Sequence, residues 1–300
     1  MSILKAALLG KEISHSTSPQ VHQALFPILS QRYASKFTGM DYSLAECAEA
    51  CDVADWIKKA ETNGFVGANV TSPYKTDAYG LSQYHIGSSS SLGSGNTLSF
   101  NSNSTSILST DGPGLLSALL REYPEFSLER YHLIALGAGA ASKAVLYALC
   151  TRWMPKSLTI VNRSREAAEE LAEFCIAESP GPSVRVLTVN EFIHDKTESK
   201  HRLLLQATPV GSVAHPGNMS TGFMWHDSDF AIDLNYNPMH TPFINSAHSV
   251  GAKTLSGLGM LIEQAAFAQG YWMTGVMPDR SALSNDEYVD LKFTLSTLVK

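Results

Sequence analysis

The stretch from 65 to 79, FVGANVTSPYKTDAY, places a single lysine, Lys75, shortly after an apolar run. The run FVGANV is typical of a buried strand, and it stops at Thr71. A lysine ammonium at the end of a strand can donate a proton to a developing alkoxide and stabilise its negative charge. A lone lysine after a strand is more often a solvated charge. The residue types by themselves leave both interpretations open.

A second candidate site is a glycine turn between an apolar strand and a helix. The strand over 133–136 leads into Gly137-Ala138-Gly139, and a helix follows from about Ala141. In dinucleotide-binding folds the first glycine makes the tight turn and the second lets the pyrophosphate approach the backbone, where the helix N-terminus offers free N–H groups. The third small position is Ser142 rather than glycine, so the turn alone is a weak signal. Its place between a strand and a helix strengthens it.

The tip of the next strand, over 158–161, bears on which dinucleotide would bind. It carries Asn162, Arg163, Ser164 and Arg165. An acid there would hold the ribose 2′-hydroxyl of NAD, whereas two guanidinium groups beside a serine suit the 2′-phosphate of NADP. The tip therefore favours NADP, with NAD as the alternative. A solvated arginine pair at a helix start is the other interpretation.

Composition describes a globular protein with substantial cores. The chain has 300 residues, of which 44% are hydrophobic and 17% charged, which suits two domains. A net charge of −6 without a Lys/Arg-rich run disfavours a nucleic-acid partner. No apolar stretch is long enough for a membrane span, and the N-terminus lacks the features of a signal peptide. The four cysteines and ten histidines form no ligand pattern, so we expect a reduced, cytoplasmic protein without a metal site.

Strand and helix patterns alternate along the chain, which predicts an α/β fold with a mainly parallel sheet in an N-terminal domain and a Rossmann-like second domain. Helices are expected over 19–33, with Ser18 as N-cap, and over 44–63, ending at Gly64. The Ser-, Gly- and Asn-rich segment 86–109 is interpreted as hairpin or linker and marks a candidate domain boundary. A helix over 113–122 should follow it.

The expected domains are a substrate-binding catalytic domain, a dinucleotide-binding domain and a set of C-terminal helices that return to the first domain. Their predicted bounds are 1–108, 109–246 and 247–300 respectively.

A series of motifs in chain order resembles the shikimate dehydrogenase family, over nearly the whole length. No single motif is decisive, but the ordered series is very specific. The motifs are Ser16-Thr17-Ser18-Pro19, Asn69-Val70-Thr71-Ser72-Pro73-Tyr74-Lys75, Asn96-Thr97, Thr110-Asp111-Gly112, Gly137 to Ala141, Asn162-Arg163-Ser164, Ala207 to Gly211, Asp233 to Pro238 and Gly257 to Gln264.

The resemblance implies an NADP-dependent oxidoreductase that reversibly reduces 3-dehydroshikimate to shikimate, in the biosynthesis of chorismate and the aromatic amino acids. It implies that Lys75 and Asp111 are the catalytic pair. The substrate-binding residues that it implies are Ser16, Ser18, Thr71, Asn96, Tyr236 and Gln264. The cofactor-binding residues that it implies are Gly137, Ala138, Gly139, Ala140, Ala141, Asn162, Arg163, Ser164, Arg165, Thr208, Leu234 and Gly257.

Within the motif series the functional interpretation of Lys75 outweighs the solvated one. We expect Asp111 to orient Lys75 and to hydrogen-bond a substrate hydroxyl, although a turn acid before Gly112 is the plainer interpretation. Ser18 could serve as a helix N-cap as well as a carboxylate ligand, because a helix start also favours an anion. A functional role is harder to dismiss for Gln264, which lies on an apolar helix face, because a buried amide needs hydrogen-bond partners.

The sequence also departs from the family motifs, which bears on substrate preference. The departures are Gly87, Ser94, Gly95, Ser109, Ala140 and Ser256. A quinate or quinate/shikimate dehydrogenase, or an enzyme for another hydroxy acid that uses NAD, is therefore the alternative. A non-catalytic metabolite sensor on the same fold is a third hypothesis, and the retention of both Lys75 and Asp111 argues against it. We expect a monomer or homodimer.

Overall fold

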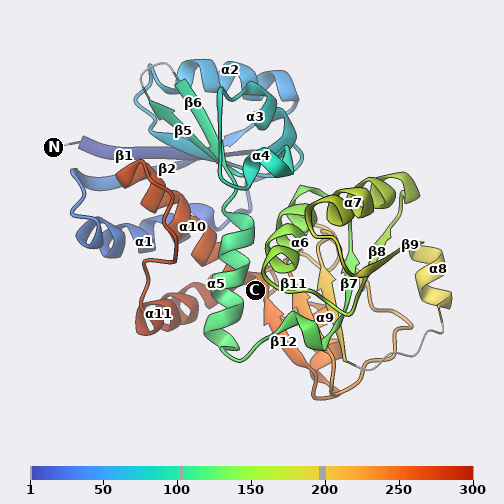
Figure 1. Ribbon diagram of the computed structural model, residues 1–300. Helices are drawn as coiled ribbons and strands as arrows, with labels where there is room; N and C mark the ends of the chain where they lie inside the picture. The colour runs from blue at the N-terminus through green and yellow to red at the C-terminus, as the bar shows by residue number, and fades with distance from the viewer. Residues whose placement is uncertain (1, 102–103, 196–200, 300) are drawn as a thin grey trace. The chain divides into compact units, whose positions relative to one another are not determined.

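The computed structural model describes residues 2–101, 104–195 and 201–299, and the chain forms two compact units. Unit 1 contains the residues up to Ser117 together with Leu261–Leu298, and unit 2 contains Ala118–Met260. Each unit is built on its own sheet, as Figure 1 shows. Each of the two sheets has six strands. The predicted domain bounds at 108 and 246 stay predictions.

The sheet of unit 1 is mixed. Its strand order is β2-β1-β3-β5-β6-β4, with β1 parallel to both β2 and β3 and with β5 antiparallel to both β3 and β6. The strands are β1 (Ser2–Gly10), β2 (Phe37–Glu46), β3 (Gly67–Val70), β4 (Tyr84–Ile86), β5 (Thr97–Asn101) and β6 (Ser104–Leu108).

Helices cover both faces of this sheet, because successive side chains of a strand point to opposite sides. On one face Leu4, Ala6 and Leu8 pack with side chains of α1 and α10. On the other face Leu9 and Val70 pack with side chains of α2 and α3. The helices of the unit are α1 (Ser18–Arg32), α2 (Ala50–Ala60), α3 (Lys75–Leu81), α4 (Ser89–Leu92), α5 (Asp111–Glu122), α10 (Gly257–Thr274) and α11 (Asn285–Ser296), of which α5 and α10 also run into unit 2.

Gly67 allows α10 to pack closely on the sheet. The Trp272 indole Nε1 donates to the Leu98 carbonyl at 2.9 Å. A Cβ atom on Gly67 would lie 2.1 Å from that nitrogen and 2.4 Å from the carbonyl oxygen. Any larger residue at 67 would therefore displace either the helix or strand β5.

Two local expectations were wrong, and the hairpin interpretation of the segment 86–109 was confirmed in part. Residues 44–46 belong to strand β2 and not to a helix, because Leu44 pairs with Leu8 of β1, and α2 begins only at Ala50. Much of the segment 86–109 forms the antiparallel pair β5–β6 inside the sheet; residues 102 and 103 lie outside the described part. The N-cap of α1 is Thr17, and no side chain caps that helix.

The sheet of unit 2 is parallel throughout, with the order β9-β8-β7-β10-β11-β12. This is the strand order of a Rossmann fold, in which ligands bind at the carboxyl ends of the strands near the point where the order reverses, here between β7 and β10. The strands are β7 (His132–Leu136), β8 (Ser157–Asn162), β9 (Ser183–Thr188), β10 (Arg202–Gln206), β11 (Phe230–Asp233) and β12 (Lys253–Ser256). The helices are α6 (Ala140–Arg152), α7 (Arg165–Glu178), α8 (Val189–His194) and α9 (Pro242–His248), and a 3-10 turn covers Leu128–Arg130. The Rossmann-like prediction is confirmed.

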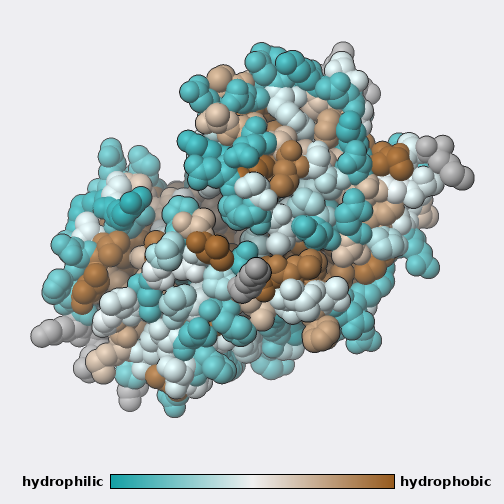
Figure 2. Space-filling model, turned by 180° about the vertical axis from the view of Figure 1, so that it is seen from behind, coloured by the Kyte–Doolittle hydropathy of each residue, from teal (hydrophilic) through white to brown (hydrophobic). Residues whose placement is uncertain are grey.

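Figure 2 shows one face of the molecule, where hydrophilic residues predominate and hydrophobic residues form small scattered groups. Within the described residues, no helix combines the length and the apolar character that crossing a membrane requires.

Candidate active site

Lys75 and Asp111 form a buried ion pair in unit 1. Lys75 is the first residue of α3 and Asp111 the first of α5, and the Lys75 Nζ lies 2.5 Å from the Asp111 Oδ2. The two residues are only 8% and 7% exposed. A negative charge is favourable at the start of a helix, so the first turn of α5 suits the carboxylate. The structure therefore excludes the interpretation of Lys75 as an ordinary solvated charge.

Asn96 holds the other oxygen of Asp111. The Asn96 Oδ1 accepts from the Thr110 main-chain N–H at 2.7 Å. A main-chain N–H can only donate, so this contact decides which way the amide points. The Asn96 Nδ2 then donates to the Asp111 Oδ1 at 3.0 Å. Asp111 is thus held at one oxygen by an amide and at the other by the ammonium.

Gln264, on α10, joins the same network. Its Nε2 donates to the Leu261 carbonyl at 3.0 Å, so its Oε1 faces Asn96 and accepts from the Asn96 Nδ2 at 3.1 Å. The Thr110 hydroxyl lies 3.3 Å from that Oε1 and 2.8 Å from the Asn96 Nδ2. Thr110 is fully buried here, although no role was predicted for it. Its only sequence signal was its place before Asp111 in T-D-G.

Asn69 is a second residue that the prediction did not assign. It is 5% exposed, and its Nδ2 donates to the Asn96 carbonyl at 3.2 Å and to the Thr97 hydroxyl at 3.0 Å. Its Oδ1 accepts from the Tyr42 hydroxyl at 2.9 Å. Asn69 therefore fixes the end of β3 against the end of β5, next to the ion pair.

Ser16 lies in the turn after β1, and Ser18 is the first residue of α1. The Ser16 Oγ donates to the Ser18 Oγ at 3.1 Å and accepts from the Ser18 main-chain N–H at 3.2 Å. The Thr71 methyl group packs on Gly10, where a Cβ atom would lie 2.4 Å from it. Thr71 therefore adjoins the end of β1, at the same edge of the sheet from which the serine turn departs.

In unit 2, the glycine turn connects β7 to α6. Gly137 has φ +107°, which disfavours side chains. Gly139 is the N-cap of α6, and a Cβ atom built on it would meet nothing within 4 Å. The first turn of α6 contains no acid. The N-terminus of α6 is therefore open and free of negative charge.

The two arginines at the tip of β8 differ in their surroundings. The Arg165 Nη2 lies 2.5 Å from both carboxylate oxygens of Glu191, and its Nη1 lies 3.8 Å from Glu169. The Ser164 hydroxyl accepts from the Ala167 N–H and so caps α7. Arg163 is exposed and has no ion pair within the described residues. Of the two guanidinium groups, that of Arg163 is available to an anion.

Unit 2 also contains Thr208, Leu234 and Tyr236, in loops at the carboxyl edge of its sheet, and Gly257, the first residue of α10. Asp233 ends β11, and burial raises its pKa from 3.8 to about 6, against hydrogen bonds from Thr241 and Asn235 that lower it.

Within the described residues, no group of three or more His, Cys, Asp or Glu could hold a metal ion.

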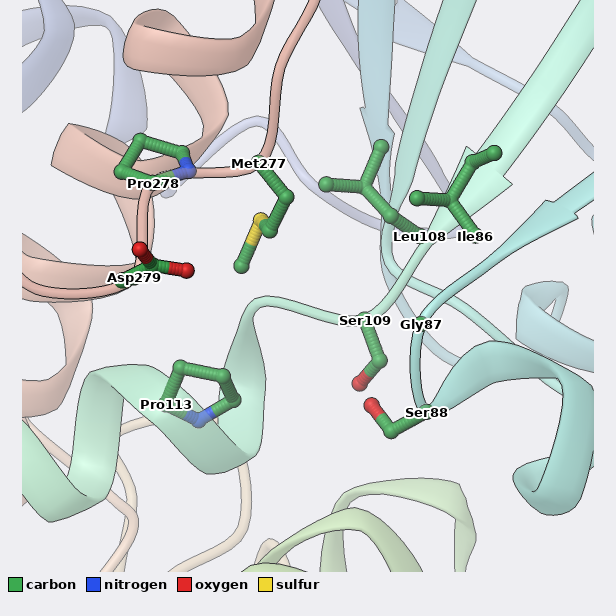
Figure 3. Close-up of a pocket in the computed structure, with 9 residues that line it drawn as sticks. All are labelled: Ile86, Gly87, Ser88, Leu108, Ser109, Pro113, Met277, Pro278 and Asp279. Atoms are coloured by element: carbon green, nitrogen blue, oxygen red, sulfur yellow. The ribbon is translucent and has the colours of Figure 1, made fainter.

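A cavity of about 210 Å³ lies in unit 1 beside the segment that leads to Asp111. Figure 3 shows the Ser88 and Ser109 hydroxyls and the Asp279 carboxylate among its apolar walls. Two of the motif departures, Gly87 and Ser109, line it. Its lining contains no cationic side chain and neither member of the ion pair, so it offers no charged partner for a carboxylate. The lining residues are Ile86, Gly87, Ser88, Leu108, Ser109, Pro113, Met277, Pro278 and Asp279.

Comparison with known proteins identifies the family. The family described as "Shikimate dehydrogenase substrate binding domain" matches residues 8–98. A shikimate dehydrogenase (NADP(+)) from Mesorhizobium japonicum is 33% identical over 281 residues, which cover 93% of each chain. The chain belongs to the shikimate dehydrogenase family.

Solved structures of the family have the same fold. A crystal structure of a shikimate dehydrogenase in complex with NADP+ is 25% identical and has a TM-score of 0.80, with 99% of this chain and 96% of that chain covered. A shikimate 5-dehydrogenase from Thermus thermophilus, in complex with NADP(H) and shikimate, is 27% identical with a TM-score of 0.73, and 97% and 99% of the two chains are covered.

Proposed function

We propose that this protein is an NADP-dependent shikimate dehydrogenase that reversibly reduces 3-dehydroshikimate to shikimate. The observation that carries the proposal is the buried pair of Lys75 and Asp111, held by Asn96 in a chain whose relatives bear this name. The site residues carried over from the motif series remain part of the proposal, except that Arg165, whose guanidinium is paired with Glu191, is not expected to contact the 2′-phosphate.

The chain's own groups suit the reduction of a ketone. The Lys75 ammonium would stabilise the developing alkoxide and donate the proton that completes the hydroxyl. Asp111 holds the ammonium in place, and the lysine would take the proton back in the oxidation direction. Ser16, Ser18 and Thr71 lie at the edge of the same sheet and offer hydroxyls to the substrate carboxylate or ring hydroxyls. Asn96 and Gln264 would bind further polar groups of the ring, and Tyr236 of unit 2 is proposed for the same task.

The residues of unit 2 fit NADP(H), whose reduced form would supply the hydride and whose oxidised form would accept it. The open, acid-free N-terminus of α6 at Gly139 fits a pyrophosphate. Arg163 fits a 2′-phosphate, and no carboxylate is present among residues 162–165 to repel it. Leu234 and Gly257 are proposed to lie at the nicotinamide.

The decisive test is a comparison of initial rates for purified protein with shikimate and quinate, each with NADP+ and NAD+. We expect the highest kcat/KM for shikimate with NADP+. Preferred oxidation of quinate, or faster turnover with NAD+, would replace the proposed substrate or cofactor. Cofactor binding without turnover of either acid would favour a sensor.

The β8 tip provides a second test. Because the Arg165 guanidinium is already paired with Glu191, Arg163→Ala should raise KM for NADP+ about 10- to 100-fold, as expected for the loss of a charge-assisted contact to phosphate. Arg165→Ala, the matched control, should change it by no more than about threefold, since exposed ion pairs contribute little. KM for NAD+ should stay unchanged in both variants. Equal effects of the two substitutions would contradict the assignment.

A further inference from the structure

The side-chain amide of Asn235 joins two loops at the carboxyl edge of the parallel sheet. Its Nδ2 lies within hydrogen-bond distance of the Thr208 carbonyl, at 3.0 Å, and of the Val210 carbonyl, at 3.2 Å. The same nitrogen lies 3.0 Å from the Asp233 Oδ1, which also accepts from the Asn235 main-chain N–H at 2.9 Å. One amide thus connects the loop after β11 with the loop after β10.

Gln206 holds the loop after β10 from its other side. It is fully buried, and its Nε2 donates to the Val210 carbonyl at 3.0 Å. Its Oε1 accepts from the main-chain N–H of Thr208 at 3.1 Å and from the Thr208 hydroxyl at 3.0 Å. The proton of the Thr208 hydroxyl is therefore engaged within the protein.

The two loops also contact the other parts of the proposed cofactor site. A Cβ atom on Gly137 would lie 2.9 Å from the Thr208 methyl group, so the loop after β10 packs on the glycine turn. A Cβ atom on Gly257 would lie 2.2 Å from the Leu234 carbonyl oxygen, and the Gly257 N–H donates to the Asn235 carbonyl at 3.1 Å. A shift of either loop would therefore be transmitted to both glycines.

We propose that Asn235 and Gln206 are positioning residues for the cofactor: they hold Thr208 and Leu234 at a fixed spacing over the switch point of the sheet. This inference rests on the proposed function. Thr208 then acts through its backbone and its methyl group, because its hydroxyl is already bonded. Asn235 acts through the loops that it joins and not by contact with the cofactor.

Asn235→Ala tests the inference. The Thr208 and Val210 carbonyls lose the donor that joins them to β11, so the dissociation constant of NADPH, measured by its fluorescence, should rise about tenfold or more. KM for NADP+ should rise with it, while KM for shikimate changes less than about twofold. Asn218→Ala is the matched control, because Asn218 ties a loop of the same unit through Ser220 and Ser246. It should leave NADPH binding unchanged.

Asn235→Asp adds a readout that general loss of stability would not produce. An ionised carboxylate cannot donate to either carbonyl, whereas a protonated one has a single O–H and can donate to one of them. Asp233, whose own pKa is about 6, is the titratable group in hydrogen-bond contact with position 235. Two carboxyl groups this close resist ionising together, so the pair should take up its first proton above the ordinary carboxyl range. The NADPH affinity of Asn235→Asp relative to Asn235→Ala should therefore increase as the pH falls from 8 to 5. Comparing the NADPH affinities of the two variants at each pH cancels the titration of the 2′-phosphate, which affects both variants equally.

The outcomes separate the inference from the function on which it rests. The inference would be overturned if Asn235→Ala bound NADPH as tightly as the wild type does. It would also be overturned if Asn218→Ala lost as much NADPH affinity as Asn235→Ala. If the wild type binds NADPH but does not oxidise shikimate, the proposed function fails, and the binding comparison still decides the inference. If the wild type binds no NADPH, both fail.

Discussion

Lys75→Ala is expected to lower kcat about 100- to 10,000-fold, the range that a positioned general acid contributes. The substitution removes the proton donor and the positive charge that would face the developing alkoxide. KM for shikimate should change only a few-fold, because the serine, threonine and amide side chains that are proposed to bind the ring remain. Steady-state rates in both directions at saturating NADP+ or NADPH measure the effect.

The stability of the variant has to be measured beside its rate. Asp111 is 7% exposed, and removal of its cation leaves a buried carboxylate without its counter-charge, which costs about 3–5 kcal/mol in comparable pairs. Asp111→Asn in the Lys75→Ala background removes that charge and should restore stability without restoring turnover. Lys58→Ala, at an exposed lysine paired with Asp55, is the control for loss of a lysine as such. Near-normal turnover in folded Lys75→Ala would refute the catalytic role.

His22→Phe is expected to flatten the dependence of stability on pH below 6.5. His22 is fully buried, and burial lowers its pKa from 6.5 to about 3. The folded state therefore holds the neutral ring, while the unfolded chain gains a proton below pH 6.5. Stability from this group is complete above pH 6.5 and is lost as the pH falls toward 3. The slope approaches about 1.4 kcal/mol per pH unit.

The ring's surroundings explain why phenylalanine is the suitable replacement. His22 stacks on Tyr42, with ring centroids 4.0 Å apart, and its Nδ1 lies 3.0 Å from the Gln269 Nε2. The Gln269 Nε2 also donates to the main-chain carbonyl of residue His22 at 2.8 Å, and the variant keeps this contact.

Urea unfolding between pH 7.5 and 4.5 should show the wild type losing about 2–3 kcal/mol more than the variant. The exposed His240→Ala should behave as the wild type does. Parallel pH profiles for wild type and His22→Phe would contradict the prediction.

The sequence alone was sufficient for the elements that depend on local patterns. The strand before Gly137 and the turn itself follow from an apolar run and two glycines within a few residues, and the helix follows directly after them. The motif series likewise predicted that Lys75 and Asp111 belong to one site, because the order of motifs along a chain is itself sequence information.

Tertiary structure decided what depends on pairing across the sheet and on competition for partners. Residues 44–46 carry a helical pattern, yet strand pairing outweighs it, because these three residues pair in register with Leu8, Leu9 and Gly10 of β1. Arg163 and Arg165 look equivalent in sequence, but Glu191, 26 positions further on, takes only the second. The roles of Asn69, Thr110, Gln206 and Asn235 appear only when the ends of neighbouring strands meet. A hydrogen bond between such ends depends on the distance and direction of two atoms, and residue spacing along the chain encodes neither.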